Sequence, residues 1–390
     1  MRLRPGIRLV LATCALACAS SPPVRAAEWI FTTIAAPDET LVRVFPGSVS
    51  MNESGEVAFI ADVRLPGGEI GRAVYRGTGG ALTTVLAPQS VATPEQWVGE
   101  TTSINAFGQV AFLLGDWSTG RIHVDEEPPL DPPVADSTGP IEGLVHPVLD
   151  DAGRVAFWAR YDGTIEQGLF TIRNGEVVKV SGGPSFRKVY WPRINGAGRL
   201  SFVYVDVHTD GEVAARVAID GGPVEIMASA GPLATPTYCD LVATDIDSAG
   251  RVAFSAGVPN ACMPRIVAAS DGAAPYDVLG PTAYPLSLRL DDAGRAVVAT
   301  IENQLVTVMN GVSEPVIGAG DALLGSTVTA LALGDAAASG RIAFSATLAD
   351  GRQLAVRADP VPEPAAAALG AVALAALAAG ARGGRRPACD

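Results

Sequence analysis

Several acidic residues in this sequence could carry out chemistry on a carbohydrate. Adjacent carboxylates occur at Asp150-Asp151 and at Asp291-Asp292, and glycosidases need only two carboxyl groups, one as acid and one as base or nucleophile. Both pairs also lie where the chain is expected to turn, so capping of the turn is the competing interpretation. The sequence has neither GxSxG nor HExxH, and its histidines share no motif, which argues against a serine hydrolase or a zinc peptidase.

The stretch DIDSAG at residues 245–250 could bind calcium. Asp245 and Asp247 alternate as calcium ligands do, but the spacing and the closing glutamate of a complete calcium loop are missing. The sequence therefore predicts no cofactor and no metal, and a calcium ion would be sought only at Asp245 and Asp247.

Aromatic residues in or beside the long connections between repeated units form a second group. They are Trp97, Phe186, Tyr190, Trp191, Tyr238 and Tyr284. If these connections gather at one mouth of a channel, the aromatic faces could line a binding site for sugar rings. The alternative is that they cover the ends of the hydrophobic cores.

An eleven-residue phrase that occurs seven times is expected to position these side chains. LDDAGRVAFWA begins at residue 149, and its relatives begin at residues 51, 104, 194, 246, 290 and 336. The glycines of the phrase are Gly55, Gly108, Gly153, Gly198, Gly250, Gly294 and Gly340. They are 44 to 53 residues apart, a period typical of propellers and solenoids.

Each copy of the phrase predicts a β-hairpin. An Asn or Asp hydrogen-bonds its own turn, and the glycine three places later provides the left-handed residue that reverses the chain. The last copy has Ala337 instead of Asn or Asp, so we expect its turn to be the loosest. In Val155-Ala156-Phe157 the alternation sends large side chains to one face and the small alanine to the other. Two apolar faces suit a strand between neighbouring sheets, so the phrase is expected to build the fold.

The two ends of the repeated region favour a closed ring. Four short strands fit one period, but only one strand follows the last hairpin, at residues 352–359, and one extra strand precedes the first, at residues 28–36. Pairing these ends would complete the last unit and hide its sheet edges. The sequence thus predicts an all-β protein: a monomeric, seven-bladed β-propeller of four-stranded blades over residues 27–360, closed by the N-terminal strand completing the last blade.

Both termini resemble targeting segments. Residues 1–26 have arginines ahead of an apolar run and small residues before a cleavage site after Ala26, as in a signal peptide, with a lipoprotein site at Cys18 as the alternative. Residues 361–390 combine a VPEP motif, a mostly Ala and Leu stretch expected to be an apolar helix, and a basic end, and this order resembles a PEP-CTERM sorting tail. The motif residues are Val361, Pro362, Glu363, Pro364, Arg382, Arg385 and Arg386.

The resemblance to a sorting tail implies a partner and a location. An exosortase-type enzyme would remove the tail after transient anchoring in the inner membrane, and the protein would reach the cell surface or the extracellular matrix. A permanent C-terminal membrane anchor is the alternative, since the apolar stretch of 17 residues at 365–381 would span about 25 Å as a helix. Either arrangement leaves the arginines in the cytoplasm.

Cysteine usage and charge agree with export. Without residues 1–26 and the segment after Pro364, only Cys239 and Cys262 remain, and they are expected to form a disulfide across the hairpin at Gly250; two free thiols are the alternative. The same region keeps 21 basic and 40 acidic residues, a net charge of −19. Such an acidic surface repels nucleic acid and anionic lipid.

The repeated phrase resembles a bacterial choice-of-anchor family described by tandem NxxGxVAF repeats and varied surface anchors. The resemblance covers nearly all of residues 27–360 and implies a surface protein, but no shared activity, since fold alone does not give function. Our leading hypothesis is a non-catalytic propeller whose loops bind matrix polysaccharide or a surface protein. The alternatives are an extracellular glycan hydrolase or lyase that uses funnel carboxylates, and a purely structural component of the envelope or matrix.

Overall fold

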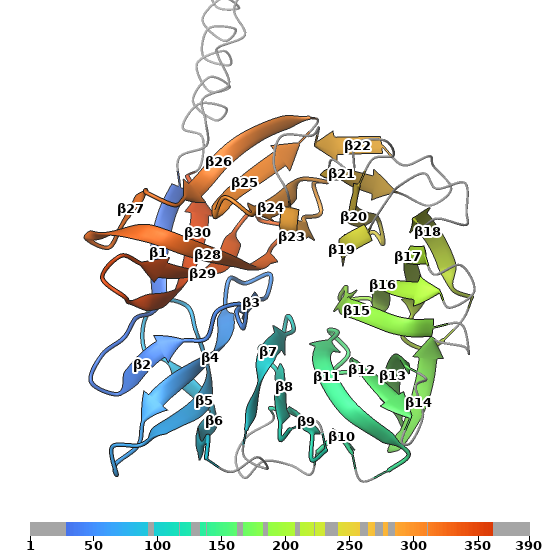
Figure 1. Ribbon diagram of the computed structural model, residues 1–390, viewed down its shortest axis with the longest axis horizontal. Helices are drawn as coiled ribbons and strands as arrows, with labels where there is room; N and C mark the ends of the chain where they lie inside the picture. Colours follow the sequence, from blue (N-terminus) through green and yellow to red (C-terminus); the bar gives the residue numbers. More distant parts are fainter. Residues whose placement is uncertain are drawn as a thin grey trace, which may run out of the picture.

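The protein is an all-β propeller in which short antiparallel sheets are arranged around a central axis (Figure 1). The computed structural model describes residues 29–92, 97–116, 118–125, 133–137, 139–161, 167–181, 186–206, 211–221, 223–230, 241–257, 264–269, 276–279, 285–309 and 311–361. The strands in these residues form seven sheets, and each sheet contains one copy of the repeated phrase. We number the units 1 to 7 by the phrase they contain. The prediction of an all-β propeller is confirmed.

The sheets of the first three units follow the order of the chain. Unit 1 consists of β2 (Leu41–Val44), β3 (Ser50–Met51), β4 (Val57–Arg64), β5 (Ile70–Gly77) and β6 (Thr83–Ser90). Unit 2 consists of β7 (Val98–Ile104), β8 (Val110–Leu114), β9 (Arg121–Val124) and β10 (Ala135–Asp136). Unit 3 consists of β11 (Ile141–Leu149), β12 (Val155–Tyr161), β13 (Gln167–Arg173) and β14 (Glu176–Ser181).

The next three units repeat this pattern of four strands. Unit 4 consists of β15 (Phe186–Ile194), β16 (Arg199–Asp206), β17 (Gly211–Ala218) and β18 (Glu225–Ala230). Unit 5 consists of β19 (Leu241–Ile246), β20 (Val252–Gly257), β21 (Pro264–Ala269) and β22 (Tyr276–Leu279). Unit 6 consists of β23 (Pro285–Leu290), β24 (Ala296–Thr300), β25 (Gln304–Met309) and β26 (Val312–Gly318).

Unit 7 combines the two ends of the described chain. It consists of β27 (Ala322–Leu323), β28 (Ser326–Ala336), β29 (Ile342–Leu348), β30 (Gln353–Pro360) and β1 (Trp29–Ala35). β1 pairs antiparallel with β30, with Trp29 opposite Pro360 and Thr33 opposite Val356. Phe31 on β1 makes an edge-to-face contact with Phe344 on β29, with 6.3 Å between the ring centroids.

The repeated phrase forms the hairpin between the first two strands of each unit, as its residue types require. In unit 3 the Oδ1 atom of Asp150 accepts hydrogen bonds from the backbone N–H groups of Ala152 and Arg154, at 3.0 and 2.8 Å. Gly153 has a φ of 77°, in the left-handed region that glycine adopts without a steric penalty. All seven glycines have φ between 77° and 84°. In the last copy the backbone bond from Gly340 to Ala337 is kept at 2.8 Å without a side-chain cap.

Hydrophobic side chains of the second strands fill the space between successive units. Phe157 of unit 3 is fully buried in a cluster that includes Ala111 of unit 2, so the large residue of one unit packs near the small residue of its neighbour. Phe59 of unit 1 shares a cluster with Ala343 of unit 7, which brings the first and last units together in the same way. The alternation of large and small residues therefore sets how closely the sheets pack.

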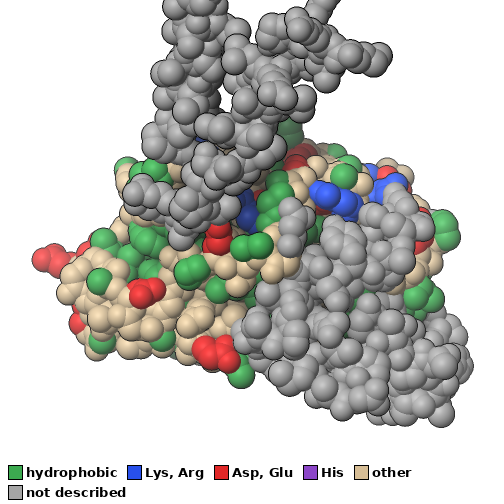
Figure 2. Space-filling model, turned by 90° about the horizontal axis from the view of Figure 1, so that it is seen from above, with side chains coloured by type: hydrophobic (Ala, Val, Ile, Leu, Met, Phe, Trp, Pro, Cys, Tyr) green, Lys and Arg blue, Asp and Glu red, His purple; other side chains and the backbone are tan. Residues whose placement is uncertain are grey.

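Charged side chains are scattered over the outer surface. Figure 2 shows one side of the molecule, where acidic and basic side chains lie among hydrophobic and uncharged groups of the described residues. Among the described residues there is no helix with the length and apolar character needed to cross a membrane.

The pairing of β1 with β30 generates a first prediction. Removing residues 29–35 should lower the free energy of unfolding by at least the cost of deleting one buried Phe side chain, about 3 to 5 kcal/mol, because Phe31 is lost and the edge of β30 is exposed. Chemical denaturation of chains that start at Ala27 and at Ala36 measures the difference. Equal stability would mean that β1 does not hold unit 7.

The turn caps generate a second prediction. Asn105→Ala should destabilise the protein by about 2 kcal/mol, because Asn105 accepts bonds from two backbone N–H groups and donates one to the carbonyl of Asp150. Ala337→Asn should instead raise the free energy of unfolding, since it adds a side-chain cap to the last copy of the phrase, which has none. Denaturation curves of both variants test this pair, and an unchanged Asn105→Ala protein would show that the caps contribute little.

Candidate functional site

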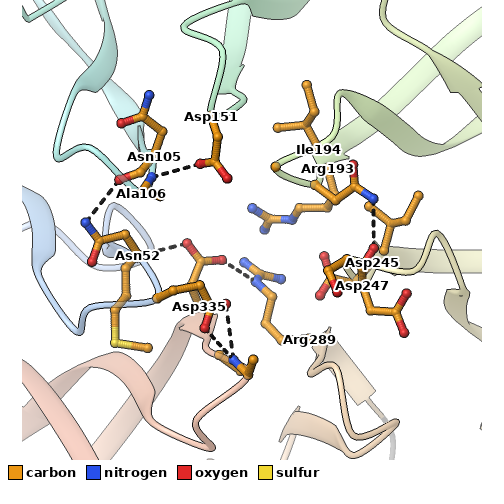
Figure 3. A pocket seen from close by; sticks show the side chains of 18 of the residues that line it. Asn52, Asn105, Ala106, Asp151, Arg193, Ile194, Asp245, Asp247, Arg289 and Asp335 are labelled. Atoms are coloured by element: carbon orange, nitrogen blue, oxygen red, sulfur yellow. Dashed lines mark hydrogen bonds and ion pairs between the residues drawn. The ribbon is translucent and has the colours of Figure 1, made fainter.

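A cavity of about 360 Å³ lies where the first strands of the units end in their hairpin turns (Figure 3). All seven units contribute to its wall, through the strand that precedes the turn of the phrase and through the turn itself, among them Ile104 on β7, Leu149 on β11 and Asn195 after β15. Pockets of this volume are large enough for a small-molecule ligand. The cavity is therefore the candidate site.

Charged residues from the last four units form the inner wall of the cavity. Each stands two places before the turn residue of its phrase: Arg193, Asp245, Arg289 and Asp335. Arg289 donates through Nε to the Asp335 carboxylate at 2.8 Å, and its Nη1 donates to the carbonyl of Leu288 at 2.7 Å. Asp335 also accepts a hydrogen bond from the backbone N–H of Met51 at 3.1 Å, which links unit 7 to unit 1.

The other two inner charges have fewer partners. Asp245 accepts a hydrogen bond from the backbone N–H of Leu290 at 2.6 Å. Burial raises its pKa from 3.8 to about 6, although Arg289 and Arg193 oppose the shift. Burial lowers the pKa of Arg193 to about 10, and the positive charge of Arg289 acts in the same direction. Arg193 lies deep in the molecule, yet its side chain keeps partial exposure because it borders the cavity.

Three carboxylates at the turns form the outer part of the wall and tie neighbouring units together. Asp151 accepts a hydrogen bond from the backbone N–H of Ala106 at 2.9 Å, and Asp292 accepts one from Ser248 at 2.8 Å. Glu53 of unit 1 accepts a bond from Ala338 of unit 7 at 2.9 Å. Burial raises the pKa of Glu53, the bond from Ala338 opposes this, and the nearby Asp292 and Asp151 raise it further.

The first acidic residue of each predicted pair is held differently. Asp150 and Asp291 each cap their own turn and bind the arginine four residues later, with Nε to Oδ2 distances of 2.7 Å for Arg154 and 2.8 Å for Arg295. Where the turn residue is asparagine, its side-chain N–H instead reaches the next unit, as from Asn195 to the carbonyl of Asp247 at 2.8 Å. Both members of each carboxylate pair thus make contacts within the scaffold.

Of the predicted aromatic residues, Trp97 does not lie at this end of the channel. Trp97 directly precedes β7, roughly 20 Å along the strand from the turn at Asn105, and the Arg72 guanidinium lies 6.0 Å from its ring centroid. Phe186, Tyr190 and Trp191 belong to β15 rather than to a connection, and Tyr238 and Tyr284 lie outside the described residues. Trp97 therefore lies at the end of β7 that the connection from unit 1 enters, and not at the end that holds the cavity.

Several other predicted residues cannot be placed. Ala26, the two cysteines Cys239 and Cys262, and the sorting tail after Val361 lie outside the described residues. Asp247 binds the backbone N–H of Arg251 at 2.8 Å through one oxygen and the Arg251 guanidinium through the other. Within the residues that the structure describes, no group of three or more His, Cys, Asp or Glu side chains is suited to hold a metal ion.

Two histidines lie in the described strands. His123 on β9 stacks on Phe112, with 5.7 Å between the ring centroids. His146 on β11 has a left-handed φ of 51°, and burial together with the positive charge of Arg193 lowers its pKa to about 4. His146 is therefore neutral at pH 7, and His208 lies outside the described residues.

Of the inner charged residues, sequence reasoning named only Asp245, as a calcium candidate, and missed Arg193, Arg289 and Asp335. Their signal is present in the repeat, because the position two places before the turn residue changes from serine in units 1 and 2 to charged residues in units 4 to 7. The spacing alone did not show that this position faces the axis, because the first strands contain bulges, such as the register shift in β15 between Tyr190 and Arg193.

Known structures resemble this protein in fold. An oligogalacturonate lyase from Vibrio parahaemolyticus matches with a TM-score of 0.58 and 12% identity over 87% of this chain and 99% of that one. The β-propeller domain of the Trilobed protease from Pyrococcus furiosus, which has an open velcro topology, matches with a TM-score of 0.54 and 12% identity over 80% and 94%. A puromycin-hydrolyzing peptidase from Mycobacterium tuberculosis matches at 0.53 and 16% over 87% and 56%.

At such low identity these likenesses show the propeller fold alone. Neither a protein-family model nor a curated protein matches the sequence.

The raised pKa of Asp245 generates a third prediction. A carboxyl group whose pKa is higher in the folded state stabilises the fold below its unfolded pKa, and this contribution is lost as the pH rises through about 6. Asp245→Asn should therefore be more stable than wild type at pH 7.5, by up to about 3 kcal/mol, and the difference should shrink toward pH 4. Denaturation at several pH values measures it.

Asp335→Asn is the matched control for this prediction. It should destabilise the protein at pH 7.5, because it leaves the buried Arg289 without its ion-pair partner. A loss of stability in Asp245→Asn at pH 7.5 would contradict the prediction and would indicate that the ionised carboxylate is needed by the arginines.

Proposed function

We propose that this protein is an exported, surface-sorted, non-catalytic β-propeller that binds matrix polysaccharide or a surface protein. We further propose that its sheets are the seven blades of a monomeric ring, which β1 closes by completing the last blade. The pairing of β1 with β30 and the shared cluster of Phe59 and Ala343 support closure. The choice-of-anchor resemblance supports a surface location.

One observation carries the non-catalytic assignment. The acidic residues that could have formed an acid–base pair are used to hold turns and to link neighbouring units, as Asp151 does with Ala106 and Asp150 does with Arg154. A glycosidase carboxylate must instead be free to exchange a proton or attack the sugar. The cavity therefore suits recognition of a ligand better than hydrolysis.

A glycan hydrolase or lyase is the second candidate function, and Asp245 is the observation that favours it. A carboxyl group with a pKa near 6 in a cavity is suited to proton transfer near neutral pH. Against this candidate, Asp245 is nearly buried and its carboxylate binds Leu290. The likeness to oligogalacturonate lyase concerns the fold and does not decide between the two functions.

A glycan-array experiment separates these functions. Residues 27–360 should bind one or a few extracellular polysaccharides, and incubation with the bound polymers should release no shorter products. Turnover that disappears in Asp245→Asn would support the enzyme instead. If the protein bound no glycan and no surface protein of the producing cell, the result would support the third hypothesis, a purely structural component of the envelope or matrix.

The sorting tail is tested separately in the producing bacterium. Replacing Pro362, Glu363 and Pro364 with alanine should leave export intact but keep the uncleaved protein in the inner membrane, because the exosortase-type enzyme would no longer recognise it. Fractionation and the mass of the C-terminus measure this. A variant that still reaches the surface normally would support the permanent-anchor alternative or another route.

A further inference from the structure

Arg193 differs from Arg289, the other arginine of the cavity wall, in how its guanidinium is held. Within the part of the chain that the structure describes, it makes neither a hydrogen bond nor an ion pair, whereas Arg289 in the same wall is bound to Asp335 and to Leu288. Figure 3 shows the Arg193 side chain pointing into the cavity. A deeply placed guanidinium without a hydrogen-bond acceptor is costly, and an anion in the cavity would remove that cost.

Two carboxylates lie near Arg193, but each is hydrogen-bonded to other groups. Asp245 and Asp335 act on it electrostatically, but neither forms an ion pair with it. Asp335 is engaged by Arg289 and Met51, and Asp245 is engaged by Leu290. The planar guanidinium of arginine presents paired N–H donors that match the two oxygens of a carboxylate.

The outer part of the cavity wall offers hydrogen-bond acceptors, whereas Arg193 offers donors. Asp151 and Asp292 each accept a hydrogen bond from a neighbouring backbone N–H through Oδ1, and the second carboxylate oxygen of each can accept a further bond. Figure 3 shows Asp151 on the side of the cavity opposite Arg289. Acceptors at this level suit a ligand that carries hydroxyl groups. Because the protein as a whole is strongly acidic, a single negative charge is admitted more readily than a polyanion.

An exposed aromatic residue stands beside the cavity at the turn of unit 2. Phe107 follows the lining residue Ala106 and is 76% exposed. The other six copies of the phrase have serine or alanine at the same position. Aromatic side chains are common in the walls of ligand-binding sites, so Phe107 is placed where it could extend this one.

Building on the proposed polysaccharide-binding function, we propose that the cavity binds a carboxylated sugar unit. Its carboxylate pairs with Arg193, its hydroxyl groups donate to Asp151 and Asp292, and Phe107 packs against the part of the glycan that leaves the cavity. Two sources share this chemistry: a free sugar acid and the terminal uronic acid of a polysaccharide chain.

Isothermal titration of the full chain with glucuronate, glucose and acetate tests the proposal. Glucuronate should bind at least about tenfold more tightly than glucose, which lacks the carboxylate, and than acetate, which lacks the hydroxyl groups. A uronate-terminated oligosaccharide that binds more tightly than free glucuronate would identify the chain end as the ligand, and the difference should be lost in Phe107→Ala. Absence of glucuronate binding, or equal binding of glucose or acetate, would overturn the proposal.

Variants separate a binding role for Arg193 from a structural one. Arg193→Gln should lose at least about tenfold in glucuronate affinity and melt at the same temperature as wild type or higher, because the unpaired charge is gone. Arg199→Gln, a change in the same unit at an exposed residue outside the cavity, should alter neither. A large fall in melting temperature for Arg193→Gln, or unchanged affinity, would contradict the proposal.

The outcomes also distinguish this site from the proposed function. Glycan-array binding that survives Arg193→Gln would keep the polysaccharide-binding function and reject the cavity as its site. Binding of free glucuronate without any glycan on the array would keep the site and reject the polysaccharide.

Discussion

The small residue in the middle of each repeated strand is the constraint on which the rest of the structure depends. A strand such as β12 is buried on both faces, so its sheet is stable only when other sheets cover it on both sides. Ala156 and its counterparts let the next sheet approach, and the phenylalanine of that sheet fills the space. Each such sheet therefore packs against a neighbour on either face, and residues of units 7 and 1 share a cluster of the same kind.

The polar residues of the phrase also hold the turns of neighbouring units in place around the axis. Asparagine and aspartate both cap the turn with one oxygen, but they use their remaining atoms differently. Asparagine donates to the carbonyl of the next unit, whereas Asp150, Asp247 and Asp291 hold an arginine four residues later. These bonds are partly buried, where an unpaired polar group is costly. Most acidic groups at the turns beside the cavity therefore stabilise the fold.

The charged residues of the inner cavity wall are held differently from those at the turns. Arg289 and Asp335 satisfy each other, whereas Arg193 is left facing the cavity. Proteins rarely retain an unpaired charge at depth without a use for it, and recognition of an anion is one such use. The propeller likeness to proteins described as a lyase, a peptidase and a protease domain shows that this fold holds unrelated sites, so the site residues and not the fold must carry the functional argument.

The sequence alone determined the architecture, because its signals are local and repeated. The turn glycines, the capping Asn or Asp, and the alternation in Val155-Ala156-Phe157 act within a few residues, so seven copies made the strands and the propeller predictable. The capping role of Asp150 was predictable for the same reason.

Tertiary structure alone decided which residues share the cavity. Arg193, Asp245 and Arg289 follow one another at intervals of 52 and 44 residues, and strand bulges change which side chains face the axis, so spacing could not show that they meet. It also placed Trp97 at the far end of β7, because antiparallel strands carry the entering connection and the hairpin turn to opposite ends. Whether a charge has a partner depends on these distant contacts, which is why only the folded protein could show that Arg193 has none among the described residues.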